Sequence, residues 1–344
     1  MNNSTARRTS RFILATLAVT MFAGAAYGQA IDGIADVDKA AKLAAKQQDG
    51  WKNKLDLGAT GAASSSSKVV GAAEGATYQI GLVLQGEAKL KAGQHAWNNE
   101  LKLQHAQTRT PVIDQFVKSA DVLDASSTWL YALESIDWIG PYARLKLNTQ
   151  VLEGYDVRSG AVNVAKTEVD GTVTNSITED GDVTDVTGFF EPLILTEGAG
   201  LFANPWDDKA FTLQAKLGGA VQQIIVQDGY AVSGYDADQN LLSLKQLETS
   251  NQAGAEFELA AKGEMTSEVS WKAKATFFFP VISTATNDFD GLDALNSDLS
   301  GSVSVKLAKW ASLDYVLSIK RIPLVLDEWQ VQHGLLLSTA FSLL

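Results

Sequence analysis

The feature that most constrains this chain is an alternation of apolar and polar residues with a period of two, which recurs from residue 50 almost to the C-terminus. Such alternation is typical of β-strands whose two faces meet different surroundings. We find twelve runs of this kind, one of which, residues 189–202, is ambiguous in phase. Their apolar faces begin at or near Trp51, Tyr78, Trp97, Leu123, Ala143, Phe189, Phe211, Ala255, Val269, Leu299, Leu313 and Val331. The sequence therefore predicts an all-β fold.

The connections between the runs alternate in length. Connections from an even to an odd run are tight, at residues 91–94, 135–140, 204–209, 263–268 and 309–312. Most of those from an odd to an even run are longer and polar, at residues 64–75, 110–120, 158–188, 228–240 and 283–297, and the last, 321–328, is of moderate length. A soluble sandwich has no reason to keep this rule, whereas an outer-membrane barrel has short turns at one end and long loops at the other.

These patterns predict a closed antiparallel transmembrane β-barrel of about twelve strands over residues 50–344, with short periplasmic turns and long extracellular loops. Closure is expected because lipid offers no hydrogen-bond partner to an exposed strand edge. The tryptophans agree with this arrangement. Trp129 lies slightly deeper, Trp329 lies at the loop end, and the others fall at the turn ends of their strands: Trp51, Trp97, Trp138, Trp206, Trp271 and Trp310. Indole rings prefer the boundary between lipid and water, so we expect an aromatic girdle.

The N-terminus has the features of a secretory signal peptide over residues 1–30. Arg7, Arg8 and Arg11 precede an apolar stretch of residues 12–26, and cleavage is expected after Ala30 or Gly28. A signal anchor is the less favoured interpretation. Residues 31–49 are expected to form a periplasmic segment, either a short amphipathic helix or a loose tail. The predicted location is the outer membrane of a Gram-negative bacterium.

Composition excludes several classes of protein. The chain has no Cys, which excludes disulfides and thiolate metal sites. Its 40 acidic and 28 basic residues leave a net charge of −12, which argues against a partner made of nucleic acid. Beyond the N-terminus there is no apolar run of the roughly 20 residues that a membrane-spanning helix needs.

The predicted inward face carries twelve bases and seven acids, and it is the most informative surface. We take as candidate pore-lining residues Lys102, Arg144, Lys146, Lys216, Lys272, Lys274, Lys306, Lys320, Glu100, Glu256 and Glu258. One interpretation is a passive pore for small polar solutes, with anions as one option. The other is a plugged lumen whose charges pair across neighbouring strands, in a barrel that is structural or binds ligands at its surface. The sequence leaves both open.

Three acidic runs fall in the predicted external loops. They are Glu179-Asp180-Gly181-Asp182 with Asp185, then Asp236 with Asp238 and Asn240, and Asp288 with Asp290, Gly291 and Asp293. Carboxylates at such spacings can bind calcium, but none of the runs has the complete twelve-residue pattern of a calcium loop. Solvated acidic loops are the favoured interpretation, and no metal site is predicted.

Catalysis has little support. His95, His105 and His333 show no evident triad or dyad with a Ser or a carboxylate, so a membrane hydrolase is a remote alternative. There is no nucleotide-binding motif, and no catalytic residue or cofactor is predicted. The expected partners are outer-membrane lipid and lipopolysaccharide, together with the barrel-insertion machinery during assembly.

Several ordered motifs over residues 50–205 resemble an uncharacterised family of bacterial outer-membrane proteins, classified as a domain of unknown function. They are Gly50-Trp51, Val69-Val70-Gly71 with Gly75, His95-x-Trp97-x-Asn99-x-Leu101-x-Leu103, Thr110-Pro111, Phe116-Val117-Lys118-Ser119-x-Asp121, Gly154-Tyr155-Asp156-Val157, Glu191-Pro192-Leu193 and Gly200-Leu201-Phe202-Ala203-x-Pro205. The resemblance implies an outer-membrane barrel and assigns no role to any residue. One departure from outer-membrane barrels in general is the C-terminus, where Phe341 stands three positions before the end instead of an aromatic last residue.

Overall fold

The computed structural model describes residues 49–66, 75–158, 160–179, 183–208, 210–286, 289, 291–308 and 311–342. The predicted signal peptide and nearly all of the segment 31–49 lie outside these ranges. The described residues form strands and one short 3-10 helix, η1 (Gly291–Ala294), so the all-β prediction is confirmed. Within the described ranges, no helix has the length and apolar character needed to span a membrane.

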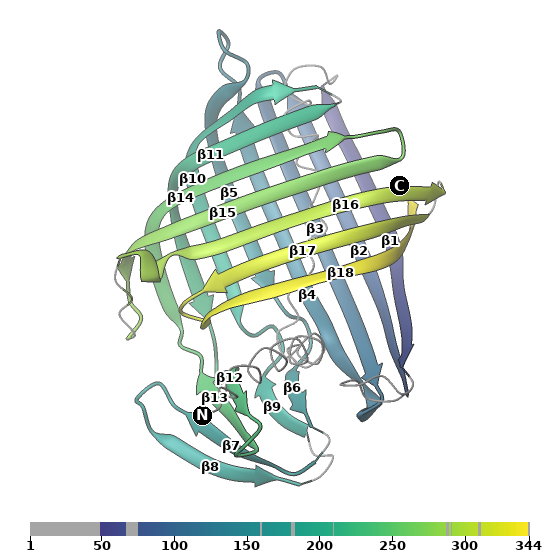
Figure 1. Cartoon of the computed structure of the whole chain (residues 1–344). Helices are drawn as coiled ribbons and strands as arrows, with labels where there is room; N and C mark the ends of the chain where they lie inside the picture. Colours follow the sequence, from purple (N-terminus) through teal and green to yellow (C-terminus); the bar gives the residue numbers. More distant parts are fainter. Residues whose placement is uncertain are drawn as a thin grey trace, which may run out of the picture.

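Twelve of the strands form a closed barrel in which every neighbouring pair is antiparallel (Figure 1). They are β1 (Gly50–Ser66), β2 (Gly75–Ala92), β3 (His95–Thr110), β4 (Ile113–Tyr131), β5 (Ile139–Thr149), β10 (Leu193–Asp207), β11 (Phe211–Ile225), β14 (Ser250–Glu264), β15 (Val269–Ser283), β16 (Asn296–Ala308), β17 (Ala311–Ile322) and β18 (Leu326–Ser342). Each strand pairs with the barrel strand that follows it in the chain. The ring closes where β1 pairs with β18, with Ala59 opposite Thr339.

Six further strands fold into two small sheets at one end of the barrel, and we call these the loop sheets (Figure 1). One has the order β12 (Tyr230–Asp236), β13 (Leu241–Gln246), β7 (Val162–Thr167) and β8 (Val173–Thr178), and the other pairs β6 (Gly154–Val157) with β9 (Val183–Thr187). The larger sheet has its own core of Val162, Val164, Leu242 and Leu244. Two of the predicted long loops, those after β5 and β11, are therefore folded.

The connections keep the predicted asymmetry with two corrections. The connections after β5, β11 and β15 are long and share one end of the barrel, which we call the loop end. The opposite end, the turn end, has only short connections. The predicted loop at residues 110–120 is wrong, because β3 and β4 continue to a tight turn at Pro111 and Val112. The connection at 321–328 is also a tight turn, at residues 323–325. At residues 110–120 the apolar alternation of the sequence ends before the backbone pairing of β3 with β4 ends.

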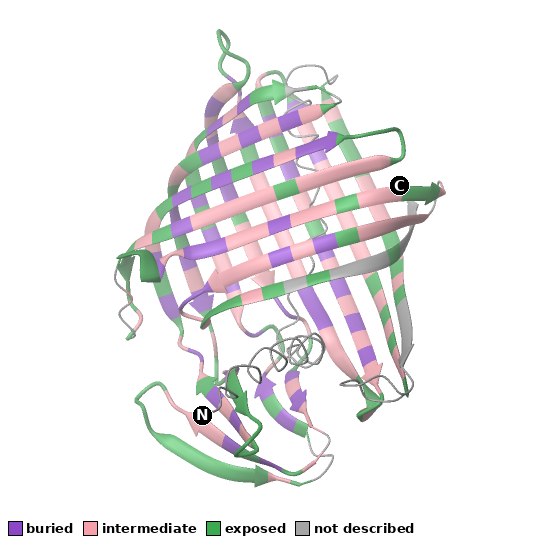
Figure 2. Cartoon of the chain, in the orientation of Figure 1, coloured by how far each residue is buried: buried purple, intermediate pink, exposed green. Residues whose placement is uncertain are grey.

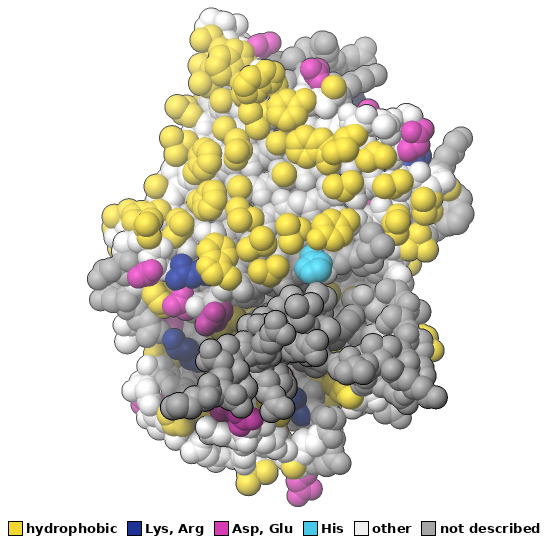
Figure 3. Space-filling view, viewed as in Figure 1, with side chains coloured by type: hydrophobic (Ala, Val, Ile, Leu, Met, Phe, Trp, Pro, Cys, Tyr) yellow, Lys and Arg dark blue, Asp and Glu magenta, His cyan; other side chains and the backbone are white. Residues whose placement is uncertain are grey.

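Burial alternates along the barrel strands (Figure 2), as expected for a wall with two different faces. The outer face is apolar, and hydrophobic side chains cover much of the side shown in Figure 3. Leu145 and Leu259 point outward, and Leu217 near the middle of β11 is 63% exposed. The ambiguous run is resolved with Thr196 and Phe202 facing inward and Leu201 facing outward. The phases predicted for these strands are thus correct.

The exposed tryptophans gather where the sequence places them. Trp51 and Trp97 lie at the turn ends of β1 and β3, with ring centroids 6.3 Å apart. Trp138 and Trp206 are also exposed at this end, and Trp129 stacks near Tyr131. Trp310 lies outside the described residues.

The closing pair of strands can be tested by cross-linking, since the chain has no native cysteine. We expect Ala59→Cys with Thr339→Cys to form a disulfide under mild oxidation, because these residues oppose each other in register. Opposed residues of antiparallel strands have Cα atoms about 4.5–5.5 Å apart. The control is Ala59→Cys with Ala311→Cys, which lies one strand further round the ring. Absence of a gel shift in the first pair, or an equal shift in both, would contradict closure.

Candidate functional site

A cluster of five charged side chains lies inside the barrel, and we call it the ion cluster. The Arg144 guanidinium on β5 donates to Glu256 at 2.5 Å and to Glu258 at 2.6 Å, both on β14. Glu258 also accepts from Lys216 at 2.8 Å and lies 3.3 Å from the ammonium of Lys274. Arg144, Glu256, Glu258 and Lys216 are all buried. Each charge is thus neutralised by a partner on another strand, as a buried charge requires.

The local sequence explains how Arg144 reaches so far. Strands β10 and β11 stand between β5 and β14 in the ring, so the side chain must cross over both. Gly198 on β10 is directly opposite Arg144 in register. A Cβ at Gly198 would already lie 3.7 Å from Glu256 Oε1 and 3.7 Å from the Ala220 side chain. The small residues Gly198 and Ala220 therefore leave the space through which the guanidinium meets the carboxylates.

The opposite wall faces this cluster with charges of its own. Glu100 on β3 is within electrostatic range of Lys89, Lys216 and Lys274. Because β3 and β15 lie on opposite sides of the ring, the attraction between Glu100 and Lys274 acts across the lumen. Lys89 is buried and bonds to Glu87 at 2.8 Å. Acids and bases are thus interleaved around this level of the barrel.

Toward the turn end the interior becomes apolar on one wall. Ala96, Leu130, Tyr142 and Phe202 form a buried cluster on the adjacent strands β3, β4, β5 and β10. Lys216 lies over the Tyr142 ring at 6.0 Å from its centroid and links this cluster to the ion cluster. Side chains therefore narrow the lumen at two successive levels.

Toward the loop end the ion cluster forms the floor of a partly open cavity. Its wall carries Lys146, Asn148, Thr196, Gln222, Thr276, Asn296, Ser297, Asp298 and Lys320, and its apolar lining consists of Ile194, Phe278 and Ile322. Ile194 and Ile322 also belong to a buried cluster with Ile224, against which Leu324 and Val325 of the β17–β18 turn pack. This turn thus reaches β10 and β11 over the end of the cavity.

The structure brings together some of the candidate pore-lining residues and separates others. Arg144, Lys216, Lys274, Glu256 and Glu258 form the ion cluster, and Lys146 and Lys320 line the cavity above it. Lys102 is buried and Glu100 half-buried on β3. Lys272 is half-buried one inward position from Lys274, whereas Lys306 is exposed near the turn end of β16.

Sequence reasoning missed the uncharged part of the cavity. Asn296 donates to Gln222 at 3.0 Å and to Gln252 at 3.3 Å, so three amides form a second polar group on the wall. These residues follow the inward phase of the sequence, but the predicted pore lining consists only of charged residues. The apolar lining residues Ile194 and Phe278 break the polar pattern of the inner face. For Ile194, the ambiguous phase of residues 189–202 is the sequence feature that indicates this departure.

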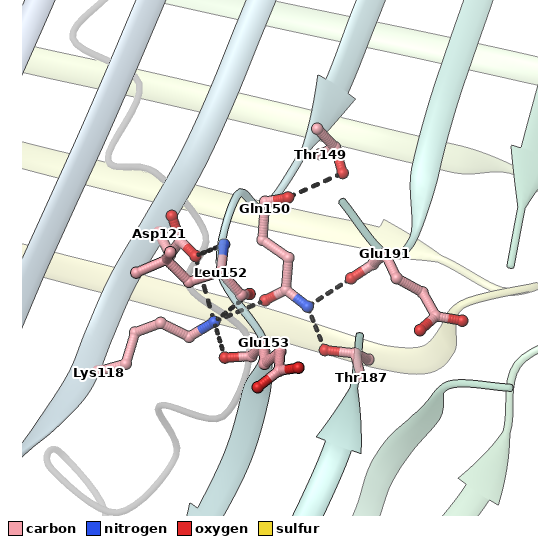
Figure 4. A network of polar contacts seen from close by, with 8 residues as sticks. All are labelled: Lys118, Asp121, Thr149, Gln150, Leu152, Glu153, Thr187 and Glu191. Atoms are coloured by element: carbon pink, nitrogen blue, oxygen red, sulfur yellow. Dashed lines mark hydrogen bonds and ion pairs between the residues drawn. The ribbon is translucent and has the colours of Figure 1, made fainter. Parts of the chain in front are cut away.

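A second polar network fixes the loop sheets to the barrel rim (Figure 4). The Lys118 ammonium donates to Asp121, to Gln150 and to the carbonyls of Leu152 and Glu153. Asp121 also accepts from the Leu152 N–H at 2.7 Å. The network thus binds the chain that leaves β5 to the side of β4, where β5 no longer pairs with it.

Glu191 joins the two long connections to each other. Its Oε1 accepts from the backbone N–H groups of Gln227, Asp228 and Gly229, and its Oε2 accepts from Gly188 N–H. The Gln150 amide in turn donates to the Glu191 carbonyl and to Thr187. The motifs around Lys118, Asp121 and Glu191 that carry the family resemblance therefore have a structural role at the rim.

Two of the three histidines, His95 and His105, lie on β3, and His333 lies on β18. His95 accepts from the Trp129 indole at 3.2 Å, and His333 lies near the Tyr315 ring. Contrary to the sequence analysis, His105 does have a neighbouring carboxylate, since Asp121 is its register partner. That carboxylate is bound to Lys118 and to the Leu152 N–H.

The acidic runs are only partly described. Asp236 accepts from the N–H groups of Asp238 and Gln239 in the β12–β13 turn. Asp180, Asp182, Asp288 and Asp290 lie outside the described residues. Among the described residues, no group of three or more His, Cys, Asp or Glu could hold a metal ion.

Comparison with known proteins gives a family match over part of the chain. Residues 70–155 match the model of a family described as "Protein of unknown function (DUF3078)", which confirms the resemblance for that segment. No curated protein matches the chain.

Solved structures similar to the chain include the beta domain of the Bordetella autotransporter BrkA, with 9% identity, a TM-score of 0.34 and coverage of 86% of this chain and 99% of that one. They also include an outer membrane channel from Pseudomonas putida F1, with 8% identity, a TM-score of 0.38 and coverage of 84% and 94%. The Pseudomonas putida toluene transporter TodX has 9% identity, a TM-score of 0.34 and coverage of 88% and 91%. With scores this low, function is inferred from the residues of this chain alone.

Removal of the shared carboxylate should destabilise the barrel strongly. Glu258→Gln leaves Lys216 and Lys274 without the charge they face, and loss of one partner from a buried ion pair costs about 3–5 kcal/mol. The matched control is Asp327→Asn, which breaks an exposed pair with Arg321 and should change stability by at most about 1 kcal/mol. The free energies come from guanidinium unfolding followed by tryptophan fluorescence. Equal effects of the two variants would contradict the burial of the cluster.

Glu191→Ala should release the connection after β11. The N–H groups of residues 227–229 lose their common acceptor, so we expect hydrogen–deuterium exchange to accelerate at these amides. The barrel amides of β14 serve as an internal reference. The exposed residue Glu134 at the turn end supplies the control variant, Glu134→Ala, which should leave exchange at 227–229 unchanged. Unchanged protection in Glu191→Ala would show that its carboxylate does not hold this segment.

Proposed function

We propose that this protein is an outer-membrane β-barrel that acts as a narrow channel for small polar solutes. The membrane assignment is supported by the closed ring of strands, which leaves no edge to be exposed to lipid. It is further supported by the apolar outer face and by the exposed tryptophans, most of which lie at the turn end. In this orientation the short turns face the periplasm, and the loop sheets lie outside the cell with lipopolysaccharide as their neighbour.

The observation that carries the channel proposal is the partly open cavity on the loop-end side of the ion cluster, which forms its floor. Rings of charged side chains at a constriction select solutes by charge and size. A solute entering from the loop end first meets the polar wall around Asn148 and Lys320. Passage beyond it requires the pairs between Arg144 and the two glutamates to rearrange. The ion cluster is therefore the constriction of the proposed channel. It excludes solutes that are too large to pass between its side chains.

A second candidate function is a barrel with a plugged lumen that binds ligands or partners at its outer surface. Two observations favour it. The charges of the ion cluster neutralise one another on one wall, and the larger loop sheet has its own core. Conductance distinguishes the two functions, because a barrel with a plugged lumen passes no current.

We expect purified, refolded protein to give small conductance steps in planar bilayers. The paired substitution Arg144→Ser with Glu256→Ser removes two long side chains from the floor without changing net charge, and it leaves Glu258 bound to Lys216 and Lys274. We expect this variant to conduct several times more current than the unsubstituted protein. Arg321→Ser with Asp327→Ser, an exposed pair at the loop end, is the control and should not alter conductance. Absence of conductance steps in the unsubstituted protein would contradict the channel and favour the barrel with a plugged lumen.

A further inference from the structure

Two residues that line the cavity each have a buried polar atom without a hydrogen-bond partner among the described residues. Arg144 bonds to the glutamates through its terminal nitrogens, but its Nε–H has no acceptor. Asn296 donates twice through its Nδ2, but its Oδ1 has no donor. The Arg144 side chain is 6% exposed and Asn296 is 6% exposed, and both line the cavity. A buried polar atom without a partner is unfavourable, so a ligand that supplies both partners would recover free energy.

The charges around the cavity favour a negative group on such a ligand. Its lining holds four bases, Arg144, Lys146, Lys274 and Lys320, and three acids, Glu256, Glu258 and Asp298. Two of these acids and two of these bases, Arg144 and Lys274, belong to the ion cluster, and outside it the lining has two bases, Lys146 and Lys320, and one acid, Asp298. A carboxylate can accept from the Arg144 Nε–H and gains from the neighbouring ammonium groups.

The apolar lining adds a requirement for the rest of the ligand. Ile194 and Ile322 are buried at the inner face, and Phe278 is 3% exposed. Apolar residues are unusual on the inward face of a barrel that carries only water and ions, because that face is normally polar. Here they offer contact to a hydrocarbon or aromatic group beside the polar atoms.

We propose that this cavity binds an organic carboxylate that also carries a hydrogen-bond donor and an apolar body, as a hydroxy acid or an amino acid with an apolar side chain does. The carboxylate lies toward Arg144 and the lysines, the hydroxyl or ammonium group donates to Asn296 Oδ1, and the apolar body contacts Ile194, Phe278 and Ile322. This inference rests on the proposed function, since it names the class of solute that the channel would admit.

Calorimetric titration of the full-length protein in detergent, with 3-phenyllactate as the probe, tests the site. Three related compounds each remove one feature: 3-phenyllactamide has no charge, 3-phenylpropanoate has no hydroxyl group, and lactate has no ring. We expect 3-phenyllactate to bind with the highest affinity and each related compound to bind about tenfold more weakly, equivalent to about 1.4 kcal/mol. Because no current is measured, a failure here is distinguishable from a failure of the channel proposal.

Variants locate the binding. Asn296→Leu and Lys320→Met should each weaken 3-phenyllactate binding about tenfold, and Asn296→Leu should abolish the preference for 3-phenyllactate over 3-phenylpropanoate. The control is Gln214→Met, a buried inward residue bonded to Asn204 near the turn end, which should bind as the unsubstituted protein does. Thermal melting of each variant confirms that it is folded. Absence of binding, equal binding of the amide, or equal affinities in Asn296→Leu and Gln214→Met would overturn the proposal.

Discussion

The structure depends on one constraint, that every strand of the wall must be hydrogen-bonded on both sides. The pairing of β1 with β18 meets this requirement and turns a sheet into a barrel. Once the ring is closed, each strand has one face outside and one face inside, and the period of two assigns every side chain to one of them. The outer face can then be apolar throughout, while polar and charged side chains are confined to the lumen, where they must find partners in one another.

The lumen illustrates how confinement determines the chemistry. Arg144 reaches the two glutamates of β14 across the small residues Gly198 and Ala220 of the intervening strands. The same contacts close the floor of the cavity, so the residues that neutralise the buried charges also set the width of the passage. Function and stability are therefore coupled at this level of the barrel. A substitution that widens the passage must also leave no buried charge without a partner, which is the reason for removing Arg144 and Glu256 together.

The loop end shows a different use of polar groups. Lys118 and Glu191 bind backbone atoms of segments far apart in the chain, and their contacts hold the loop sheets against the rim. Their motifs are more distinctive in sequence than the residues of the cavity, although they carry no evident chemistry. The cavity is instead built from ordinary inward residues of many strands, such as Gln222, Asn296 and Ile322, none of which belongs to a recognisable motif.

The sequence alone determined the class of fold, the outward phase of residues such as Leu145 and Leu217, and the end of the barrel at which the long connections gather. These follow from local periodicity, which depends only on neighbours in the chain. It failed at residues 110–120, because backbone pairing continues there after the apolar alternation ends. Only the tertiary structure decided that Arg144 meets Glu256 and Glu258, that Asn296 stands beside Gln222, and that the β17–β18 turn packs against β10 and β11. Such contacts depend on the curvature of the closed wall and on the length of each side chain, and neither is expressed in the alternation of a single strand.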